Sequence, residues 1–351
     1  MAMNYRQEFL ASMPLLGSRT YTDIFSGDWY QQCLASGTLN DDDVLLMFSV
    51  DGAQLYEHKA SDCWIYIWVI LDLSPDQRYK KYHVIPGGFI PGPGKLKNLD
   101  SFLFPGLFHI AALQCEGFCV YNALTRKILN KRPLIALASA DAPGMAQISG
   151  YVGHNGAKGC RKMCKLPGCR KDKKGTYYPL CQKPENYSVD NCSHGDISLH
   201  TWPVQFLQHQ YNEDVLAVMN CHTLAKYNKT RRATGIVKPS IFSGIQTVFG
   251  APGIFPLDSM HLLALNVLDL LLSLWHGTLK AGTGDDKETW DWAVLKDKDI
   301  WEEHGTLVQG FQKHLPSEYD CPPRNPAEKI NSSYKAAEYL TYIYGYLPLL
   351  L

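Results

Sequence analysis

The chain has 351 residues, enough for one large domain or for a core domain that carries an insertion. Hydrophobic residues make up 46% and charged residues 19%, so a packed core is expected rather than a disordered chain. The 34 basic and 34 acidic side chains balance, and any binding of nucleic acid must therefore depend on local clusters of charge.

The first part of the chain predicts a helix followed by three strands. Residues 1–40 are expected to form a short helical lead-in without a strong motif. Strands are expected at Val44–Val50, Cys63–Leu73 and Tyr82–Ile90, because these runs are rich in β-branched, aromatic and other apolar residues. A helix is expected at Leu99–Gly117, where apolar residues recur at helical spacing.

A fourth strand is expected at Leu134–Ala140, and Met145–Val152 is expected to begin the next helix. The order strand, strand, strand, helix, strand, helix matches a ribonuclease H-like core, in which the first and fourth strands lie side by side. The sequence therefore predicts an α/β fold with a mixed sheet flanked by helices. Residues 41–152 would form the first part of this core.

The rest of the chain predicts a long insertion and a return to the core. Residues 153–325 are expected to be mostly helical or irregular, with a strong apolar helix at Ser259–Trp275. Residues 326–351 would supply the C-terminal helix of the core, in which Tyr334–Leu340 has helical character.

Three acids occupy positions that suit a metal-dependent site. Asp51 and Asp141 follow the first and fourth predicted strands, and Glu338 lies in the last predicted helix. Adjacent strands lie about 4.8 Å apart, so carboxylates at neighbouring strand ends can share the hard divalent ions that prefer oxygen ligands. Taken singly, each acid is more often a turn or surface residue, and the strand order is what favours a shared site. Glu328 and Asp269 are the alternatives for the third acid.

The 11 cysteines are an odd number, and the polar N-terminal residues do not resemble a signal peptide. A reducing compartment is expected, in which clustered cysteines are more often metal ligands than disulfides. Cys160 and Cys164 have the spacing of a zinc knuckle, and Cys169 and His261 could complete four ligands. The alternatives are unligated thiols and a core histidine preceded by Asp258 as a helix cap.

The same cysteine-rich segment is strongly basic, with Asp172 as its one acid between residues 158 and 174. Lysine and arginine dominate contacts to the phosphate backbone of DNA, although a solvated loop would look similar in sequence. The candidate DNA-binding residues are Lys158, Arg161, Lys162, Lys165, Arg170 and Lys171. The longest apolar runs are too short to span a membrane, which needs about 20 residues.

Several of these motifs together resemble the transposases of CACTA (En/Spm-like) DNA transposons, most of all the fungal branch. The resemblance runs from about residue 45 to the end of the chain. The motifs that carry it are Asp51–Tyr56, Ile90–Gly94, Ala140-Asp141, Gly153–Gly156, Asp258–Leu262, Pro322–Asn331 and Lys335–Glu338.

The resemblance implies a ribonuclease H-like core of the DDE superfamily that cuts and rejoins DNA with Mg²⁺ or Mn²⁺. Asp51 and Asp141 match the two aspartates of the family, and Glu338 matches the glutamate that follows a Lys-Ala-x motif. It further implies a nuclear protein that binds transposon ends and target DNA and assembles on them as a homo-oligomer.

The chain also departs from the family pattern. Cys160-x₃-Cys164 replaces a common Cys-x-x-Cys, and the usual N-terminal DNA-binding region is absent from this sequence. The chain stops soon after the predicted catalytic helix. A truncated or inactive transposon-derived module that binds DNA or protein is therefore the alternative function. A nuclease of the same fold acting on RNA or structured DNA is a third.

Overall fold

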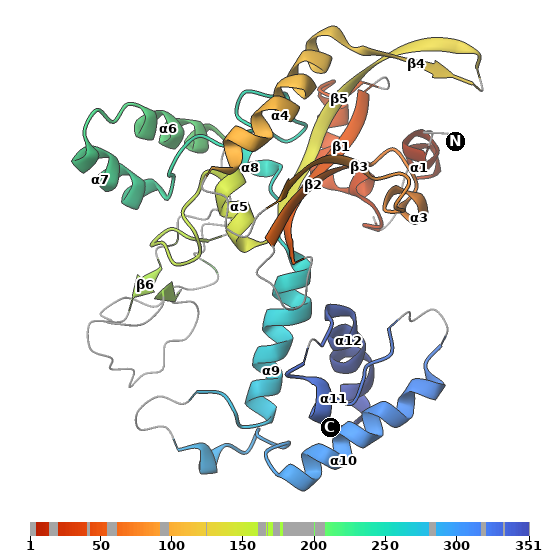
Figure 1. The fold of residues 1–351 in the computed structure, drawn as a ribbon, viewed down its shortest axis with the longest axis vertical. Coiled ribbons are helices and arrows are strands. Elements are labelled where there is room, and N and C mark those ends of the chain that lie inside the picture. Colours follow the sequence, from red (N-terminus) through yellow and green to blue (C-terminus); the bar gives the residue numbers. More distant parts are fainter. Residues whose placement is uncertain are drawn as a thin grey trace. The chain divides into compact units, whose positions relative to one another are not determined.

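The computed structural model describes most of the chain, in two compact units, Met1–Leu257 and Asp258–Leu351. Each unit is described by itself, and both are drawn in Figure 1. The residues described are 5–13, 20–40, 43–54, 62–91, 98–123, 125–160, 166, 168–170, 176–177, 200, 208–280, 286–316, 321–332 and 334–350.

A five-stranded mixed sheet forms the centre of the first unit, with strand order β3-β2-β1-β5-β4. β1 pairs with β5 in parallel, whereas the β1–β2, β2–β3 and β4–β5 pairs are antiparallel. The strands are β1 (Asp43–Gln54), β2 (Asp62–Ile70), β3 (Ile85–Pro91), β4 (Phe118–Asn122) and β5 (Lys127–Ala140). The predicted adjacency of the first strand and the strand ending at Ala140 is confirmed.

The hairpin of β4 and β5 was not expected from the sequence. β5 begins at Lys127 and not at Leu134, and its first half pairs with β4. Polar residues such as Lys127 and Asn130 interrupt the apolar run in this half, where most side chains are exposed or half-buried. A continuous buried run marks only the second half of the strand, which is the part that sequence patterning can detect.

An irregular segment extends the sheet beyond β5. Thr247 forms a parallel bridge with Ile135, and the Val248 N–H donates to the Ile135 carbonyl at 2.9 Å. Further along, the Ala138 N–H donates to the Ile254 carbonyl at 2.8 Å. This segment therefore runs alongside the second half of β5, on the side away from β1. The sheet arrangement is compatible with a ribonuclease H-like core.

Helices cover both faces of the sheet, as Figure 1 shows. The predicted helix at Leu99–Gly117 is confirmed as α4, and the lead-in contains helices. The helix expected to begin at Met145–Val152 is present as α5 but begins earlier, at Ala142. The helices of this unit are α1 (Tyr5–Ser12), a 3-10 turn (Ile24–Ser26), α2 (Asp28–Ala35), α3 (Pro75–Arg78), α4 (Leu99–Glu116), α5 (Ala142–Ser149), α6 (Gln208–Met219), α7 (Leu224–Thr234) and α8 (Gly250–Gly253). A two-stranded ribbon is formed by β6 (Cys169–Arg170) and β7 (Thr176–Tyr177).

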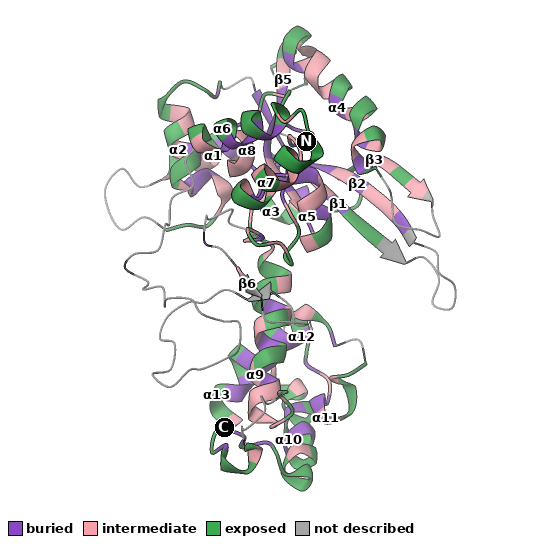
Figure 2. Cartoon of the chain, turned by 90° about the vertical axis from the view of Figure 1, so that its left-hand side faces the viewer, coloured by how far each residue is buried: buried purple, intermediate pink, exposed green. Residues whose placement is uncertain are grey.

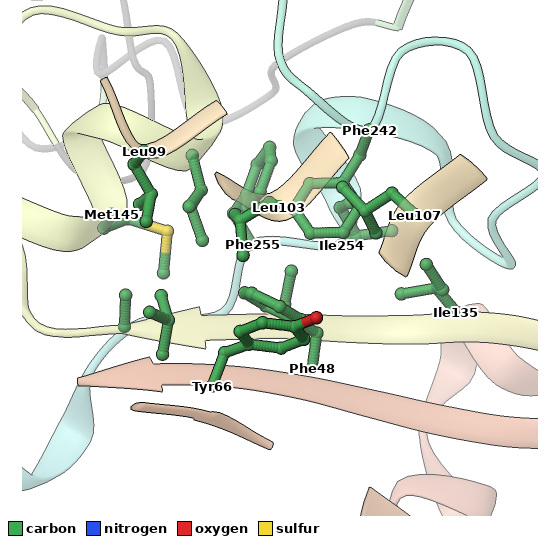
Figure 3. Packing of buried hydrophobic residues seen from close by; sticks show 14 of the residues in the cluster. Phe48, Tyr66, Leu99, Leu103, Leu107, Ile135, Met145, Phe242, Ile254 and Phe255 are labelled. Atoms are coloured by element: carbon green, nitrogen blue, oxygen red, sulfur yellow. The ribbon is translucent and has the colours of Figure 1, made fainter. Parts of the chain in front are cut away.

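Alternation along β1 divides the core of the first unit into two layers. Phe48 and Val50 lie in a cluster with Leu103 of α4 and Met145 of α5, shown in Figure 3. Leu45 faces the opposite side, in a cluster with residues of the N-terminal helical segment. Successive strand side chains point to opposite faces, so this strand is buried on both sides of the sheet.

Part of the expected insertion belongs to the sheet unit. Tyr211, Val215, Ile236, Phe242 and Ile254 are buried in the same cluster as the sheet residues. The compact unit extends to Leu257, beyond the expected start of the insertion at residue 153. These apolar residues are scattered among polar ones, and they pack together because of tertiary contacts that the sequence pattern does not show.

The second unit is helical where it is described. The predicted helix at Ser259–Trp275 is present as a π-helical segment (Met260–Asn266) that continues into α9 (Val267–Trp275). The other helices are a 3-10 turn (Lys287–Thr289), α10 (Lys298–Gly310), a 3-10 turn (Phe311–His314), α11 (Pro326–Lys329), α12 (Ala336–Leu340), a π-helical turn (Thr341–Tyr346) and α13 (Leu347–Leu350).

The second unit has its own hydrophobic core. Leu268 and Leu272 of α9 pack with Val308 of α10 and with Tyr342 and Ile343 of the C-terminal helical segment. The burial colours of Figure 2 show buried residues in both units. None of the helices in the described ranges is both long enough and apolar enough to cross a membrane.

Candidate metal site at two neighbouring strand ends

The structure places Asp51 inside β1, which runs on to Gln54 and not only to Val50 as expected, and Asp141 directly after β5, the adjacent parallel strand. Val50 of β1 is in register with Ala140 of β5, and each aspartate is the next residue. Because adjacent strands lie about 4.8 Å apart, the two backbones are close enough for both carboxylates to reach one metal ion or a pair of ions. The parallel register brings the two backbones close together, and the meeting of the two carboxylates stays a prediction.

Asp141 is held by a helix cap. It is the N-cap residue of α5, and its Oδ1 accepts a hydrogen bond from the Gly144 N–H at 2.7 Å. A cap of this kind satisfies a free backbone donor and fixes the carboxylate orientation. The cap uses one carboxylate oxygen, and among the described residues no hydrogen bond to Oδ2 is found. The ordinary turn role of this aspartate is therefore present, and it leaves an oxygen for a ligand.

Asp51 is exposed, and its Oδ1 accepts a hydrogen bond from the neighbouring Gly52 N–H at 2.7 Å. Within the described ranges, neither Asp51 nor Asp141 forms an ion pair with a basic side chain. Two carboxylates on adjacent strands repel one another when both are ionised. A divalent cation relieves that repulsion and takes oxygen ligands, so the donor set fits Mg²⁺ or Mn²⁺.

Trp64 and Gly144 shape the surroundings of the two aspartates. Trp64 of β2 is paired with Gly52, next to Asp51, and packs at the edge of the main hydrophobic cluster. A Cβ atom on Gly144 would lie 2.8 Å from Asp141 Oδ1 and 3.0 Å from the Ala140 Cβ. The same atom would be 3.8 Å from the Trp64 ring, so the start of α5 approaches both β2 and β5 closely.

Glu338 lies in the second unit, in α12, and is 2% exposed. Its Oε1 accepts hydrogen bonds from Arg324 Nε at 2.6 Å and from the Arg324 backbone N–H at 3.2 Å. Its Oε2 accepts from Arg324 Nη2 and from the Lys335 N–H, both at 2.9 Å. Burial raises the pKa of Glu338, but these hydrogen bonds outweigh burial and bring the pKa below its ordinary value.

This environment is that of a structural carboxylate, since each oxygen already accepts two hydrogen bonds. Its use as a metal ligand, which the sequence predicted, would require Arg324 to move away. The two fallback acids are more accessible. Glu328 of α11 and Asp269 of α9 are both exposed, and both belong to the second unit.

The predicted zinc ligands are described in part. Cys160 is half-buried with a free thiol, whereas Cys164 lies outside the described residues. Cys169 belongs to β6, where the backbone alone is described. His261 belongs to the second unit, and its Nδ1 is 2.6 Å from Asp258 Oδ2. No group of three or more His, Cys, Asp or Glu residues that could hold a metal ion is found within the described ranges.

The predicted cap at Asp258 is confirmed, because its Oδ1 accepts the His261 N–H at 3.0 Å. His261 is 39% exposed at its side chain and is therefore not a core histidine.

Of the predicted DNA-binding residues, Lys158 lines a cavity of about 530 Å³ in the first unit. Arg170 is in β6, where its backbone alone is described. Arg161, Lys162, Lys165 and Lys171 lie outside the described residues. Sequence reasoning did not include Arg231 and Arg232, which line the same cavity. The sequence feature that could have indicated these two arginines is the short basic run at residues 229–232.

Comparison with known proteins gives no relative from which a role could be transferred. No protein family model matches the chain, and no curated protein matches it.

Proposed function

We propose that this protein is the catalytic part of a DDE-type DNA transposase, which cleaves and joins DNA strands with divalent metal ions. The observation that carries the proposal is the parallel register of β1 and β5, in which the residue before Asp51, Val50, pairs with the residue before Asp141, Ala140. The sheet arrangement and the motifs shared with CACTA transposases support the same function. DNA, as transposon ends and as target, would be the partner.

The two aspartates would have different roles. Asp51 is exposed and lies on the central strand β1, so it is our candidate for a carboxylate shared between two ions. Asp141 is oriented by its cap on α5 and would complete one metal site through Oδ2. Bound Mg²⁺ or Mn²⁺ would supply the activation of water or of a 3′-hydroxyl and the stabilisation of the leaving oxygen.

The third acid is proposed from the second unit. Glu338 is the candidate that the Lys-Ala-x-Glu motif indicates, with Glu328 and Asp269 as alternatives. A structural zinc held by Cys160, Cys164, Cys169 and His261 also stays a prediction. The remaining proposals come from the family resemblance: a ribonuclease H-like core, a nuclear location and assembly of a homo-oligomer on DNA.

Nicking of supercoiled plasmid in the presence of Mn²⁺ tests the catalytic proposal. We expect the wild type to nick the plasmid, and Asp51→Asn and Asp141→Asn to abolish nicking because each removes a charged metal ligand. Glu116→Gln is the matched control, since Glu116 is an exposed acid of the same unit at the end of α4. Equal nicking by all four proteins would show that a different site, or a contaminant, cuts the DNA.

One observation favours a second candidate function. Both oxygens of Glu338 are engaged by Arg324 and by backbone N–H groups, as expected if this chain lacks a third metal ligand. A transposon-derived module that binds DNA or protein without cutting DNA would have this property. It predicts retained DNA binding together with no metal-dependent nicking by the wild type.

A further inference from the structure

A second site in the first unit is separate from the two aspartates. A cavity of about 530 Å³ lies between the loop that follows α5 and the C-terminal end of α7. Backbone hydrogen bonds join its two walls: the Val152 N–H donates to the Gly235 carbonyl, and the Val237 N–H donates to the Gly150 carbonyl, both at 2.8 Å. The cavity is therefore part of the folded unit, and its volume is within the range of ligand pockets.

Basic side chains from two distant parts of the sequence meet in this cavity. Lys158 comes from the loop after α5, and Arg231 and Arg232 come from the last turn of α7. Gly235 ends α7 with φ of 82°, and a Cβ atom there would lie 2.7 Å from the Lys158 Cβ. The end of the helix is thus packed directly against Lys158. This packing keeps the three basic residues at the same cavity.

The charge on α7 exceeds what helix capping requires. Its sequence, LAKYNKTRRAT, has four basic residues and no acidic residue, and none of its residues is buried. Cations in the last turn offset the helix dipole, which accounts for Arg231 and Arg232 but not for Lys226 and Lys229. Within the described residues these four side chains form no ion pair. Arg231 is positioned over the ring of Tyr227, 5.8 Å from its centroid.

We propose that this cavity and the exposed side of α7 bind the phosphodiester backbone of DNA. The planar guanidinium groups of Arg231 and Arg232 can each donate two hydrogen bonds to phosphate oxygens, and Lys158 adds a further cation. Asn155 also lines the cavity and supplies a neutral amide. This set of groups recognises a phosphate chain, and it contains no feature that selects a base.

The cavity lies at a distance from the two aspartates that would let one DNA molecule contact both, and this step rests on the proposed function. Helix α5 begins at Ala142, directly after Asp141, and ends at Ser149, close to the cavity wall at Tyr151. An eight-residue helix is about 12 Å long. Duplex DNA advances about 3.4 Å per nucleotide of one strand, so a phosphate held here would be about three or four steps from the cut.

Binding of a fluorescent 20-base-pair duplex, measured by anisotropy in EDTA over a series of salt concentrations, tests the inference without cleavage. Each phosphate contact contributes about 0.9 to the slope of log affinity against log salt. We expect Arg231→Gln combined with Arg232→Gln to lower that slope by about 2 and to weaken binding by about 10- to 100-fold at 0.1 M salt. Lys158→Gln alone should lower the slope by about 1.

The control is Lys80→Gln combined with Lys81→Gln, which removes two exposed positive charges from the same unit outside the cavity. It should bind DNA within about twofold of the wild type. Circular dichroism should show that all variants are folded. Equal weakening by both double variants would attribute the effect to net charge and overturn the inference. Unchanged binding by the Arg231 and Arg232 variant would overturn it as well.

Two further measurements separate the possible ligands and the two proposals. Tighter binding of an RNA duplex of equal length, or full competition by millimolar inorganic phosphate, would reject DNA backbone as the ligand. Asp51→Asn should bind the duplex as well as the wild type. If Asp51→Asn loses nicking but binds the duplex normally, both proposals are supported. If the Arg231 and Arg232 variant binds the duplex normally, the cavity proposal is overturned and the catalytic proposal stands.

Discussion

Asp141 has the capping role that sequence reasoning set against metal binding, and we propose that it binds metal as well. Its Oδ1 caps α5 through the Gly144 N–H, and the cap fixes the carboxylate one residue after Ala140, which is paired with Val50 of β1. A residue used as a helix cap can therefore also be oriented for metal binding. The cap makes the position of this carboxylate sensitive to the residues at the start of the helix.

Gly144→Ala should disturb Asp141 without removing it. The new Cβ would be 2.8 Å from Asp141 Oδ1 and 3.0 Å from the Ala140 Cβ, so the carboxylate or the helix must shift. We expect nicking to fall by about tenfold or more, because small displacements of positioned groups are costly in catalysis. Gly244→Ala is the control, since a Cβ at that position meets no atom within 4 Å. Similar nicking by both variants would show that the capped position of Asp141 is unimportant.

Glu338 gives a prediction about acid stability. Its pKa is below the ordinary 4.5, so the ionised carboxylate stabilises the folded second unit, and this stabilisation is lost as pH falls through the lowered pKa. Glu338→Gln should cost on the order of 2 kcal/mol at pH 7, because it weakens hydrogen bonds between charged groups. The cost should shrink as the pH is lowered below 4.5.

Urea denaturation at a series of pH values measures this dependence. The control is Glu303→Gln, an exposed residue of α10 in the same unit. A cost for Glu338→Gln that does not change between pH 7 and pH 3 would contradict the structural role of the ion pair with Arg324.

At the scale of elements, α1 is attached to the sheet by a buried ion pair. Arg6 Nε lies 3.1 Å from Asp72 Oδ1, and Arg6 Nη2 donates a hydrogen bond to the Asp43 carbonyl at 3.0 Å. Asp72 also accepts the Leu45 N–H at 2.7 Å. Burial raises the pKa of Asp72, and the charge of Arg6 opposes that rise.

Arg6→Ala should therefore destabilise the first unit by about 3 kcal/mol, because it leaves a buried carboxylate without its partner. The pKa of Asp72 should rise further in this variant, so the folded state should bind the proton more tightly and regain stability as the pH is lowered. Lys81→Ala, at an exposed position, should have little effect. Chemical denaturation at pH 7 and pH 5 checks the prediction, and equal destabilisation at both values would contradict it.

The elements that the sequence predicted are those whose burial follows a simple period. Strand β1 and the second half of β5 are apolar runs, and α4 has regularly spaced apolar residues, so all three were found. The hairpin of β4 was missed because β4 is a short strand with no buried residue and begins two residues after α4 ends. The edge segment at residues 247–254 has no strand pattern and is held by a few backbone hydrogen bonds to β5.

At the scale of the whole molecule, the sequence could indicate the adjacency of the strands that precede or contain Asp141 and Asp51 but not the environment of Glu338. The first depends on strand order, which recurring patterns reveal. The second depends on Arg324, a partner whose side chain reaches the carboxylate through the tertiary fold of the second unit. The grouping of Lys158 with Arg231 and Arg232 was hidden for the same reason.

The two units have separate hydrophobic cores, so each destabilising change should act first on its own core. Hydrogen exchange should rise in α9 and α12 of the Glu338→Gln variant and in β1 and β5 of the Arg6→Ala variant. Exchange that rises equally throughout the chain in either variant would show that the units unfold together.

The central claim is that Asp51 and Asp141 hold divalent metal together. Titration of the metal-free protein with Mn²⁺, followed by electron paramagnetic resonance of the free ion, tests it most directly. We expect the wild type to bind Mn²⁺, and Asp51→Asn and Asp141→Asn each to remove at least one bound ion, whereas Glu116→Gln binds as the wild type does. Identical binding curves for all four proteins would contradict the account.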